Sequence, residues 1–135
     1  MKILLLCLLL STLYADDAKL ASGIFNNIVQ SITKKTKPKV YIHFDIEALE
    51  KHPGLIVRVE KCTEADIVLL SSLKKIPASC NDKVLFGTRY FHLKNSKVVG
   101  SFFWQKGRPN ILFYQKRLDR YNLKLDAGFN KYIEP

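Results

Sequence analysis

Four consecutive apolar residues, Ile67–Leu70, constrain the fold of this chain most strongly, because they leave no polar face. A strand of this kind has to be covered on both sides, as strands of α/β sheets are. The segment Leu55–Glu60 is rich in β-branched and apolar residues and predicts a second strand packed on two faces. Both strands therefore require helices or other segments above and below one sheet.

The segments before these strands alternate between helical and extended patterns. Six apolar residues between positions 16 and 33 share one helical face: Leu20, Ile24, Phe25, Ile28, Val29 and Ile32. After Pro38, Val40–Phe44 alternates and predicts a strand with Val40, Ile42 and Phe44 inward. Asp45 is a suitable N-cap for a short helix that extends to Lys51.

The last third of the chain predicts an antiparallel hairpin. Lys97–Gln105 and Asn110–Tyr114 have strand patterns, and Lys106-Gly107-Arg108-Pro109 joins them. A further short strand is predicted at Lys83–Phe86. Gln115–Leu125 then predicts an amphipathic helix. Its apolar residues Leu118 and Tyr121 would face inward, and its cations would face outward: Lys116, Arg117 and Arg120.

Alternating helices and strands followed by a hairpin predict an α/β fold: a single mixed β-sheet with helices on its faces and a C-terminal antiparallel hairpin. Residues 1–15 predict a signal peptide, with Lys2 before the apolar run Ile3–Leu10 and Ala15 at the cut. That run is shorter than the roughly 20 residues a membrane-spanning helix needs. We therefore expect a single domain over residues 16–135, exported to the periplasm, with no transmembrane helix.

Removal of residues 1–15 would leave Cys62 and Cys80 as the two cysteines. An even number in an oxidising compartment predicts one disulfide, and two buried free thiols are the alternative. The formal net charge of +10 suggests an acidic partner. Export makes nucleic acid an unsuitable partner and favours an anionic envelope surface, formed by lipid headgroups or cell-wall polymers, or an acidic face of another protein. The charge could also serve solubility alone.

The sequence contains no recognisable catalytic, metal or cofactor motif. His43, His52 and His92 have no metal-ligand spacing. Ser71 and Ser72 follow a predicted strand, where α/β proteins place functional loops, but no base or acid accompanies them. We expect a protein without enzymatic activity, and an undetected hydrolase is the remaining alternative.

Aromatic and cationic residues gather in and after the predicted hairpin. Arginine beside an exposed aromatic ring suits capture of carboxylates or a protein interface. We therefore predict a partner- or anion-binding site at Trp104, Lys106, Arg108, Arg117 and Arg120. The alternative is that Phe102, Phe103 and Trp104 are core residues and that the turn is only a solvated connection.

In order and pattern, residues 18–129 resemble the YfiR family of periplasmic regulators. The matching patterns are Gly100-x-Phe102-x-Trp104, Gly107-Arg108, Ile111-x-Phe113 and Asn122-Leu123-x-Leu125. Asn122 stands where the family has glycine, and it can adopt the same left-handed conformation. Tyr114, Asp126 and Ala127 depart from the family pattern.

The resemblance implies a regulator that binds the periplasmic part of an inner-membrane signalling protein, as in repression of a diguanylate cyclase. It also implies disulfides and a homodimer. A small solute- or envelope-polymer-binding protein that uses the cationic, aromatic surface is the alternative function.

Overall fold

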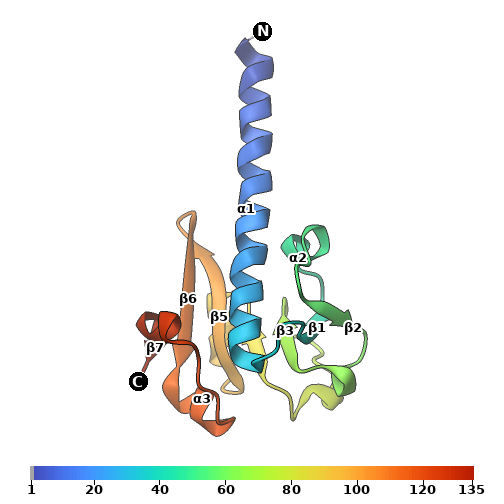
Figure 1. The fold of residues 1–135 in the computed structure, drawn as a ribbon, viewed down its shortest axis with the longest axis vertical. Coiled ribbons are helices and arrows are strands. Elements are labelled where there is room, and N and C mark those ends of the chain that lie inside the picture. The colour runs from blue at the N-terminus through green and yellow to red at the C-terminus, as the bar shows by residue number, and fades with distance from the viewer. Residues whose placement is uncertain (1) are drawn as a thin grey trace.

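The structure, a computed structural model, describes residues 2–135, with side chains described from Asp17 onward. Within them, one seven-stranded mixed sheet has the order β2-β1-β3-β4-β5-β6-β7 (Figure 1). Its strands are β1 (Lys39–His43), β2 (Val57–Val59), β3 (Ile67–Leu70), β4 (Leu85–Gly87), β5 (Val98–Gln105), β6 (Arg108–Tyr114) and β7 (Ile133–Glu134). The predicted α/β class, with a single mixed sheet and a hairpin, is confirmed.

The strand directions bring several loops to one edge of the sheet. Strands β2, β1, β3, β4 and β5 are parallel, β6 is antiparallel to β5, and β7 is parallel to β6. The chain passes from β1 outward to β2 and then returns to β3 on the other side of β1. The order therefore reverses between β1 and β3, and open α/β sheets bind ligands outside the carboxyl ends of strands at such a point.

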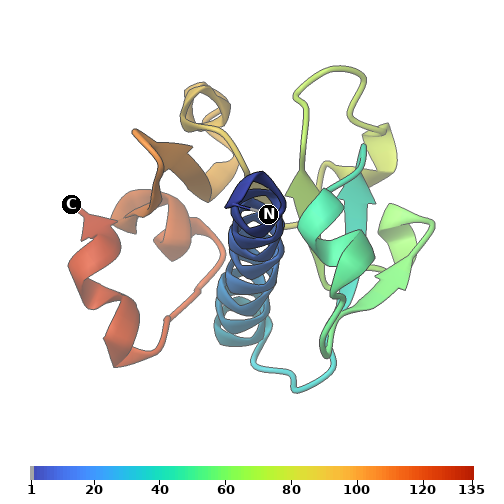
Figure 2. The ribbon, with the colours of Figure 1, turned by 90° about the horizontal axis from the view of Figure 1, so that it is seen from above.

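One face of the sheet packs against helix α1 (Lys2–Thr33), which crosses the middle of the molecule (Figure 2). Phe25, Ile28, Val29 and Ile32 are buried there as predicted, whereas Leu20 is half exposed, contrary to the inward position expected of it. The two other α-helices of the described chain are α2 (Glu47–Lys51) and α3 (Gln115–Arg120).

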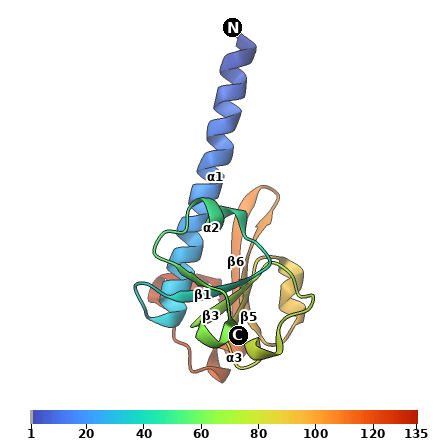
Figure 3. The ribbon, with the colours of Figure 1, turned by 90° about the vertical axis from the view of Figure 1, so that its right-hand side faces the viewer.

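The predicted signal peptide, residues 1–15, lies outside the residues whose side chains are described. From Lys2 onward its backbone continues helix α1, which extends well beyond the sheet (Figure 3). Among the described residues, no helix combines the length and apolar character needed to cross a membrane.

Three short 3-10 segments cover the opposite face of the sheet: η1 (Cys62–Glu64), η2 (Ala78–Cys80) and η3 (Tyr90–Lys94). A fourth, η4 (Ala127–Tyr132), follows α3. In β3, Ile67 and Leu69 belong to the core under α1, and Val68 and Leu70 belong to the core under the 3-10 segments. All four residues are fully buried, which confirms that this strand is covered on both sides.

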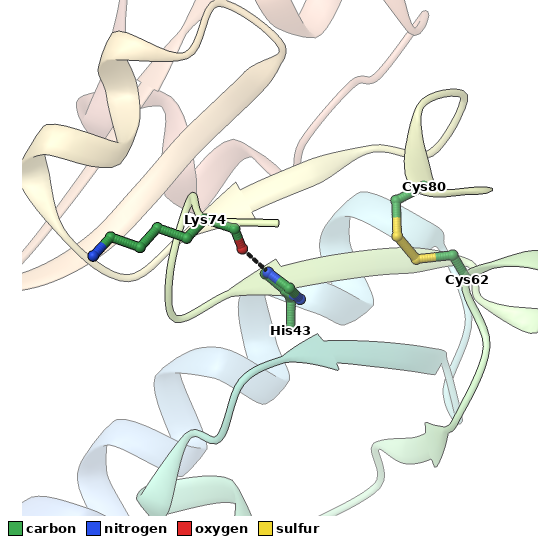
Figure 4. The surroundings of a disulfide bond; sticks show 4 residues. All are labelled: His43, Cys62, Lys74 and Cys80. Atoms are coloured by element: carbon green, nitrogen blue, oxygen red, sulfur yellow. Dashed lines mark hydrogen bonds between the residues drawn. A yellow bond between two sulfur atoms is a disulfide. The ribbon is translucent and has the colours of Figure 1, made fainter. Parts of the chain in front are cut away.

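A disulfide joins Cys62 in η1 to Cys80 in η2, as predicted (Figure 4). The two Cα atoms are 5.1 Å apart, and 18 positions separate the cysteines in the sequence. Both side chains are buried in the core of the second face. The bond therefore fastens together the two connections that cover β3 where no long helix does so.

The predicted two-sided burial of Leu55–Glu60 is wrong. β2 is the edge strand of the sheet, and Leu55 and Val57 are both more than 40 % exposed. The predicted N-cap at Asp45 is also wrong, because Ile46 occupies that position without a side-chain bond. The Asp45 carboxylate instead accepts a hydrogen bond from the Arg58 guanidinium at 3.0 Å.

The helix expected over Gln115–Leu125 is shorter in the structure and ends at Arg120. Asn122 follows with a φ of 54°, which is the left-handed conformation expected of it. Leu118 is buried, and the chain beyond Asn122 returns to the core through Leu123 and Leu125.

Removing the disulfide should destabilise the protein. In the chain-entropy model, a loop of this size contributes about 3 kcal/mol to the free energy of unfolding. We expect Cys62→Ser and Cys80→Ser each to lower that free energy by this amount in denaturant titrations. Reductant should have the same effect on the wild-type protein and no further effect on either variant. A wild-type midpoint that does not change with reductant would contradict the prediction.

Candidate functional site

The turn of the β5–β6 hairpin contains only Lys106 and Gly107, so the expected four-residue connection is shorter in the structure. Their φ angles are 52° and 74°. Two positive φ angles are typical of a type I′ turn, whose twist matches that of the flanking strands. Gln105 pairs with Arg108 directly beside the turn, and Trp104 pairs with Pro109. The turn is therefore a tight extension of the sheet.

Of the three aromatic residues near the end of β5, only Trp104 is exposed. Phe102 is 2 % exposed and packs edge-to-face on Phe25 of α1, with ring centroids 4.9 Å apart. Phe103 is buried on the other face against Tyr90. Trp104 is 43 % exposed, so the expectation that most of this run is core holds for its two neighbours and not for the indole.

Lys106 and Arg108 are both exposed near Trp104. Within the described part of the chain, neither has an acidic partner within ion-pair distance. Three of the five residues predicted to bind a partner are thus exposed at or beside the turn, and we call them the hairpin tip: Trp104, Lys106 and Arg108. Because Arg108 pairs with Gln105, its side chain leaves the hairpin on the face opposite to that of Trp104.

The other two predicted residues lie far from the hairpin tip, at the opposite end of β5. Arg117 donates hydrogen bonds to the carbonyl oxygens of Leu93, Asn95 and Val98 at 2.8, 3.2 and 2.9 Å. Six residues separate Val98 from Trp104, which corresponds to about 20 Å along a strand. The expectation that Arg117 faces outward is therefore wrong.

Arg117 and Arg120 fasten the end of η3 to α3. The Arg117 guanidinium lies 4.6 Å from the centroid of the Tyr114 ring, in a cation–π arrangement. Arg120 donates a hydrogen bond to the Ser96 carbonyl at 2.9 Å. Both arginines thus satisfy backbone carbonyls of the η3–β5 connection, and Arg120 remains exposed to solvent.

A groove of about 680 Å³ lies at the carboxyl ends of β1, β3, β4 and β5. Each of these strands contributes the residues that follow or end it. We call this cavity the carboxyl-edge groove, and its lining residues are Ala21, Phe25, Asp45, Ile46, Glu47, Ala48, Ser71, Thr88, Arg89, Tyr90, Phe91, Phe102, Phe103, Trp104 and Gln105. Its size and its place beside the reversal of strand order are typical of ligand sites in α/β proteins.

Exposed aromatic side chains line this groove. Tyr90 is 62 % exposed and Phe91 is 53 % exposed, and Trp104 stands at the end of β5. Phe44, at the end of β1, is 55 % exposed with a φ of 61°, so it is not the inward strand residue that the alternation predicted. Clustered exposed rings are typical of binding surfaces.

Arg89 is the one cationic residue in the lining of the carboxyl-edge groove. Both its backbone N–H and its backbone carbonyl oxygen form hydrogen bonds with side chains. Its N–H donates to Nδ1 of His92 at 3.2 Å, and its carbonyl accepts from the Ser101 hydroxyl at 2.8 Å. The Thr88 N–H also donates to Nδ1 of His92, at 3.0 Å. His92 can approach this loop because Gly87 has no side chain: a Cβ there would lie 2.7 Å from the Cβ of His92.

His92, in the η3 connection between β4 and β5, is fully buried. Nδ1 accepts two amide protons, so the neutral ring has its own proton on Nε2, which has no partner among the described residues. Burial lowers the pKa of the His92 imidazole from 6.5 to about 4, with a smaller contribution from the Arg89 charge. The ring is thus a neutral cap for the loop that positions Arg89.

The hydroxyls singled out in the sequence have different surroundings. Ser71 lines the carboxyl-edge groove, as a strand-end serine should. Ser72 accepts a hydrogen bond from the Lys74 amide at 3.1 Å, which is a turn contact. His43 shares a hydrogen bond with the Lys74 carbonyl at 2.6 Å (Figure 4). Within the described chain, no group of three or more metal-binding side chains gathers.

Sequence reasoning missed Arg89, Tyr90 and Phe91. The available signal was their position, since they follow the apolar segment Val84–Gly87 and parallel strands have functional loops at their carboxyl ends. Comparison with protein-family models, curated proteins and solved structures finds no match to this chain.

Loss of the Arg117 guanidinium should destabilise the fold. Arg117→Ala removes the guanidinium that donates to three part-buried carbonyls, of which Asn95 keeps a hydrogen bond from the Val98 amide, and we expect a decrease of about 3 kcal/mol in the free energy of unfolding. Arg117→Lys should recover only part of this, because one ammonium group lacks the planar geometry. The exposed neighbour Lys116 is the matched control, and Lys116→Ala should change stability by less than about 0.5 kcal/mol.

The low pKa of His92 should make stability depend on pH. Between pH 6.5 and 4 the unfolded state binds the proton and the folded state does not, so the free energy of unfolding falls as the pH decreases. We expect a loss of about 2 kcal/mol from this group between pH 7 and pH 5. Asn is the suitable replacement because its side-chain oxygen can accept the same amide protons without titrating.

Urea titrations at both pH values, on wild-type protein and His92→Asn, measure this loss. The variant should show little change in stability across the interval. An equal loss in both proteins would mean that other groups titrate there instead.

Proposed function

We propose that this chain is an exported, non-enzymatic regulator that binds the periplasmic part of an inner-membrane signalling protein, and that it does so through the hairpin tip. The observation that carries the proposal is one tight turn that exposes Trp104 on one strand and presents Lys106 and Arg108, two cations without acidic partners in the described structure, within four residues of it. The resemblance to YfiR-type regulators motivates the class of partner.

The chemistry of the hairpin tip suits a protein interface. Tryptophan and arginine are enriched among residues that dominate binding energy, and the fixed I′ turn limits the entropy lost on binding. Lys106 and Arg108 would meet acidic side chains, which agrees with the net charge of +10. A disulfide between buried cysteines is compatible with an exported protein.

The carboxyl-edge groove supports a second candidate function, binding of a small solute. Its volume of about 680 Å³ lies within the range of small-molecule sites, and most of its lining is apolar or aromatic. Trp104 lines the groove and is also part of the hairpin tip. A solute in the groove would therefore lie beside the surface proposed for the partner.

The regulatory function can be tested by capture of partners from solubilised envelope membranes. With the purified protein as bait, we expect an inner-membrane signalling protein to be recovered. Trp104→Ala and Arg108→Glu should each reduce its recovery by about tenfold or more, as substitutions at interface hot spots do. If the partner is a diguanylate cyclase, the same two variants should raise the cellular level of cyclic di-GMP when they replace the wild-type protein at equal abundance.

Lys116→Glu is the matched control, because Lys116 is an exposed cation on α3, beyond the opposite end of the hairpin. It should leave both recovery and signalling unchanged. Equal recovery with all three variants would remove the hairpin tip from the interface. Recovery of lipid or polymer alone, lost at high salt, would contradict the regulatory function.

A further inference from the structure

We propose that the carboxyl-edge groove binds an acyl carboxylate, with its hydrocarbon chain between α1 and α2 beneath Trp104 and its carboxylate at Arg89. This inference deepens the second candidate function, rests on it, and is independent of the regulatory one. Three properties of the groove support it: an apolar floor, an extension between α1 and α2, and the charges of its lining residues.

The floor of the groove is apolar. Phe25 and Phe102 are 4 % and 2 % exposed and close it from below, and Ile46 is 8 % exposed beside them. A polar solute there would lose its hydration without gaining hydrogen bonds, which is unfavourable. A hydrocarbon chain would instead gain free energy in proportion to the apolar area that it buries.

The groove continues along the two helices. A second depression of about 320 Å³ has four lining residues in common with it: Ala21, Glu47, Ala48 and Trp104. Ala18 of α1 also lines this extension. The short side chains of these three alanines leave open space between α1 and α2, with the Trp104 indole at the junction. The extension also has charged residues at its rim, Asp17, Glu47 and Lys51. Two adjoining depressions that share Trp104 and the alanines suit an extended chain better than a compact ring.

The charges of the groove suit one anionic head group. Arg89 forms no ion pair among the described residues, and its backbone is fixed by His92 and Ser101. Ser71 and Thr88 also line the groove, and the Thr88 hydroxyl donates a hydrogen bond to the Leu70 carbonyl at 2.9 Å. A carboxylate there could accept charge-assisted hydrogen bonds from the guanidinium.

The acidic side chains of the groove are already paired. Asp45 lies 3.0 Å from the Arg58 guanidinium, and Glu47 lies 2.8 Å from the Lys51 ammonium. Among the charged side chains that line the carboxyl-edge groove itself, Arg89 is therefore the one without an ion pair.

Trp104 is the single tryptophan of the chain, so its fluorescence reports directly on the groove. The test is a titration of the protein, expressed as the full chain and purified from the envelope, with decanoate below its critical micelle concentration. Decanol and decyltrimethylammonium are the controls, with the same chain and no negative charge. We expect a saturable blue shift of the Trp104 emission with decanoate and an affinity at least about fivefold lower for both controls.

Two substitutions test separately the contact with the carboxylate head group and the contact with the hydrocarbon chain of the ligand. Arg89→Gln should lower the affinity for decanoate by about fivefold and leave that for decanol unchanged. Lys94→Gln, which removes an exposed cation of η3 outside the groove, should have no effect. Ala48→Leu should fill the space between the helices and abolish the response to both compounds, and Ala48→Met replaces it if thermal unfolding shows that the leucine variant does not fold.

Three outcomes would overturn the proposal: no response of Trp104, equal affinities for the three compounds, or undiminished binding by the Ala48 variant. Native mass spectrometry of the same protein shows whether only the acyl-carboxylate proposal has failed or the solute-binding function as a whole. A co-purified solute of another class would exclude the acyl carboxylate and retain that function. Neither result bears on the capture of a signalling protein by the hairpin tip.

Discussion

The burial of β3 on both faces is the constraint on which the rest of the structure depends. Ile67–Leu70 has no exposed residue, so each face of the sheet needs a cover. Helix α1 covers one face, and short 3-10 segments cover the other. Such short segments bury little area by themselves, and the Cys62–Cys80 bond compensates by joining two of them. Because β3 lies between β1 and β4 and is parallel to both, the loops that follow these strands meet at one edge of the sheet.

The proposed functions both derive from that edge. Parallel strands bring Asp45, Ser71, Thr88 and Trp104 to a common groove although they lie far apart in the sequence. Trp104 lines the groove and is also the first residue of the hairpin tip. A ligand in the groove and a partner at the turn would therefore lie on either side of the same indole, although each candidate function can be tested without the other.

Local patterns predicted the elements well where one physical rule dominated. Helical periodicity located the buried face of α1, and the apolar run located β3 to the residue. Gln115–Leu125 shows the limit: its amphipathic pattern extends past Arg120, yet Asn122 turns the backbone left-handed, so that Leu123 and Leu125 reach the core without a helix. The exposed β2 was misjudged because β-branched residues occur on edge strands as well as on central ones.

By itself, the sequence determined the α/β class and predicted the cysteine pair, because these depend on neighbours within a few positions or on a count. Whether Trp104 is a core residue or exposed stayed open until the tertiary structure placed it. Only the tertiary structure decided which arginines are free. Arg117 and Arg108 look alike as cations after an aromatic segment, but the carbonyls that Arg117 binds are 19 to 24 residues away in the chain. Arg89 entered the site for the same reason, since strand order alone brings its loop beside Trp104.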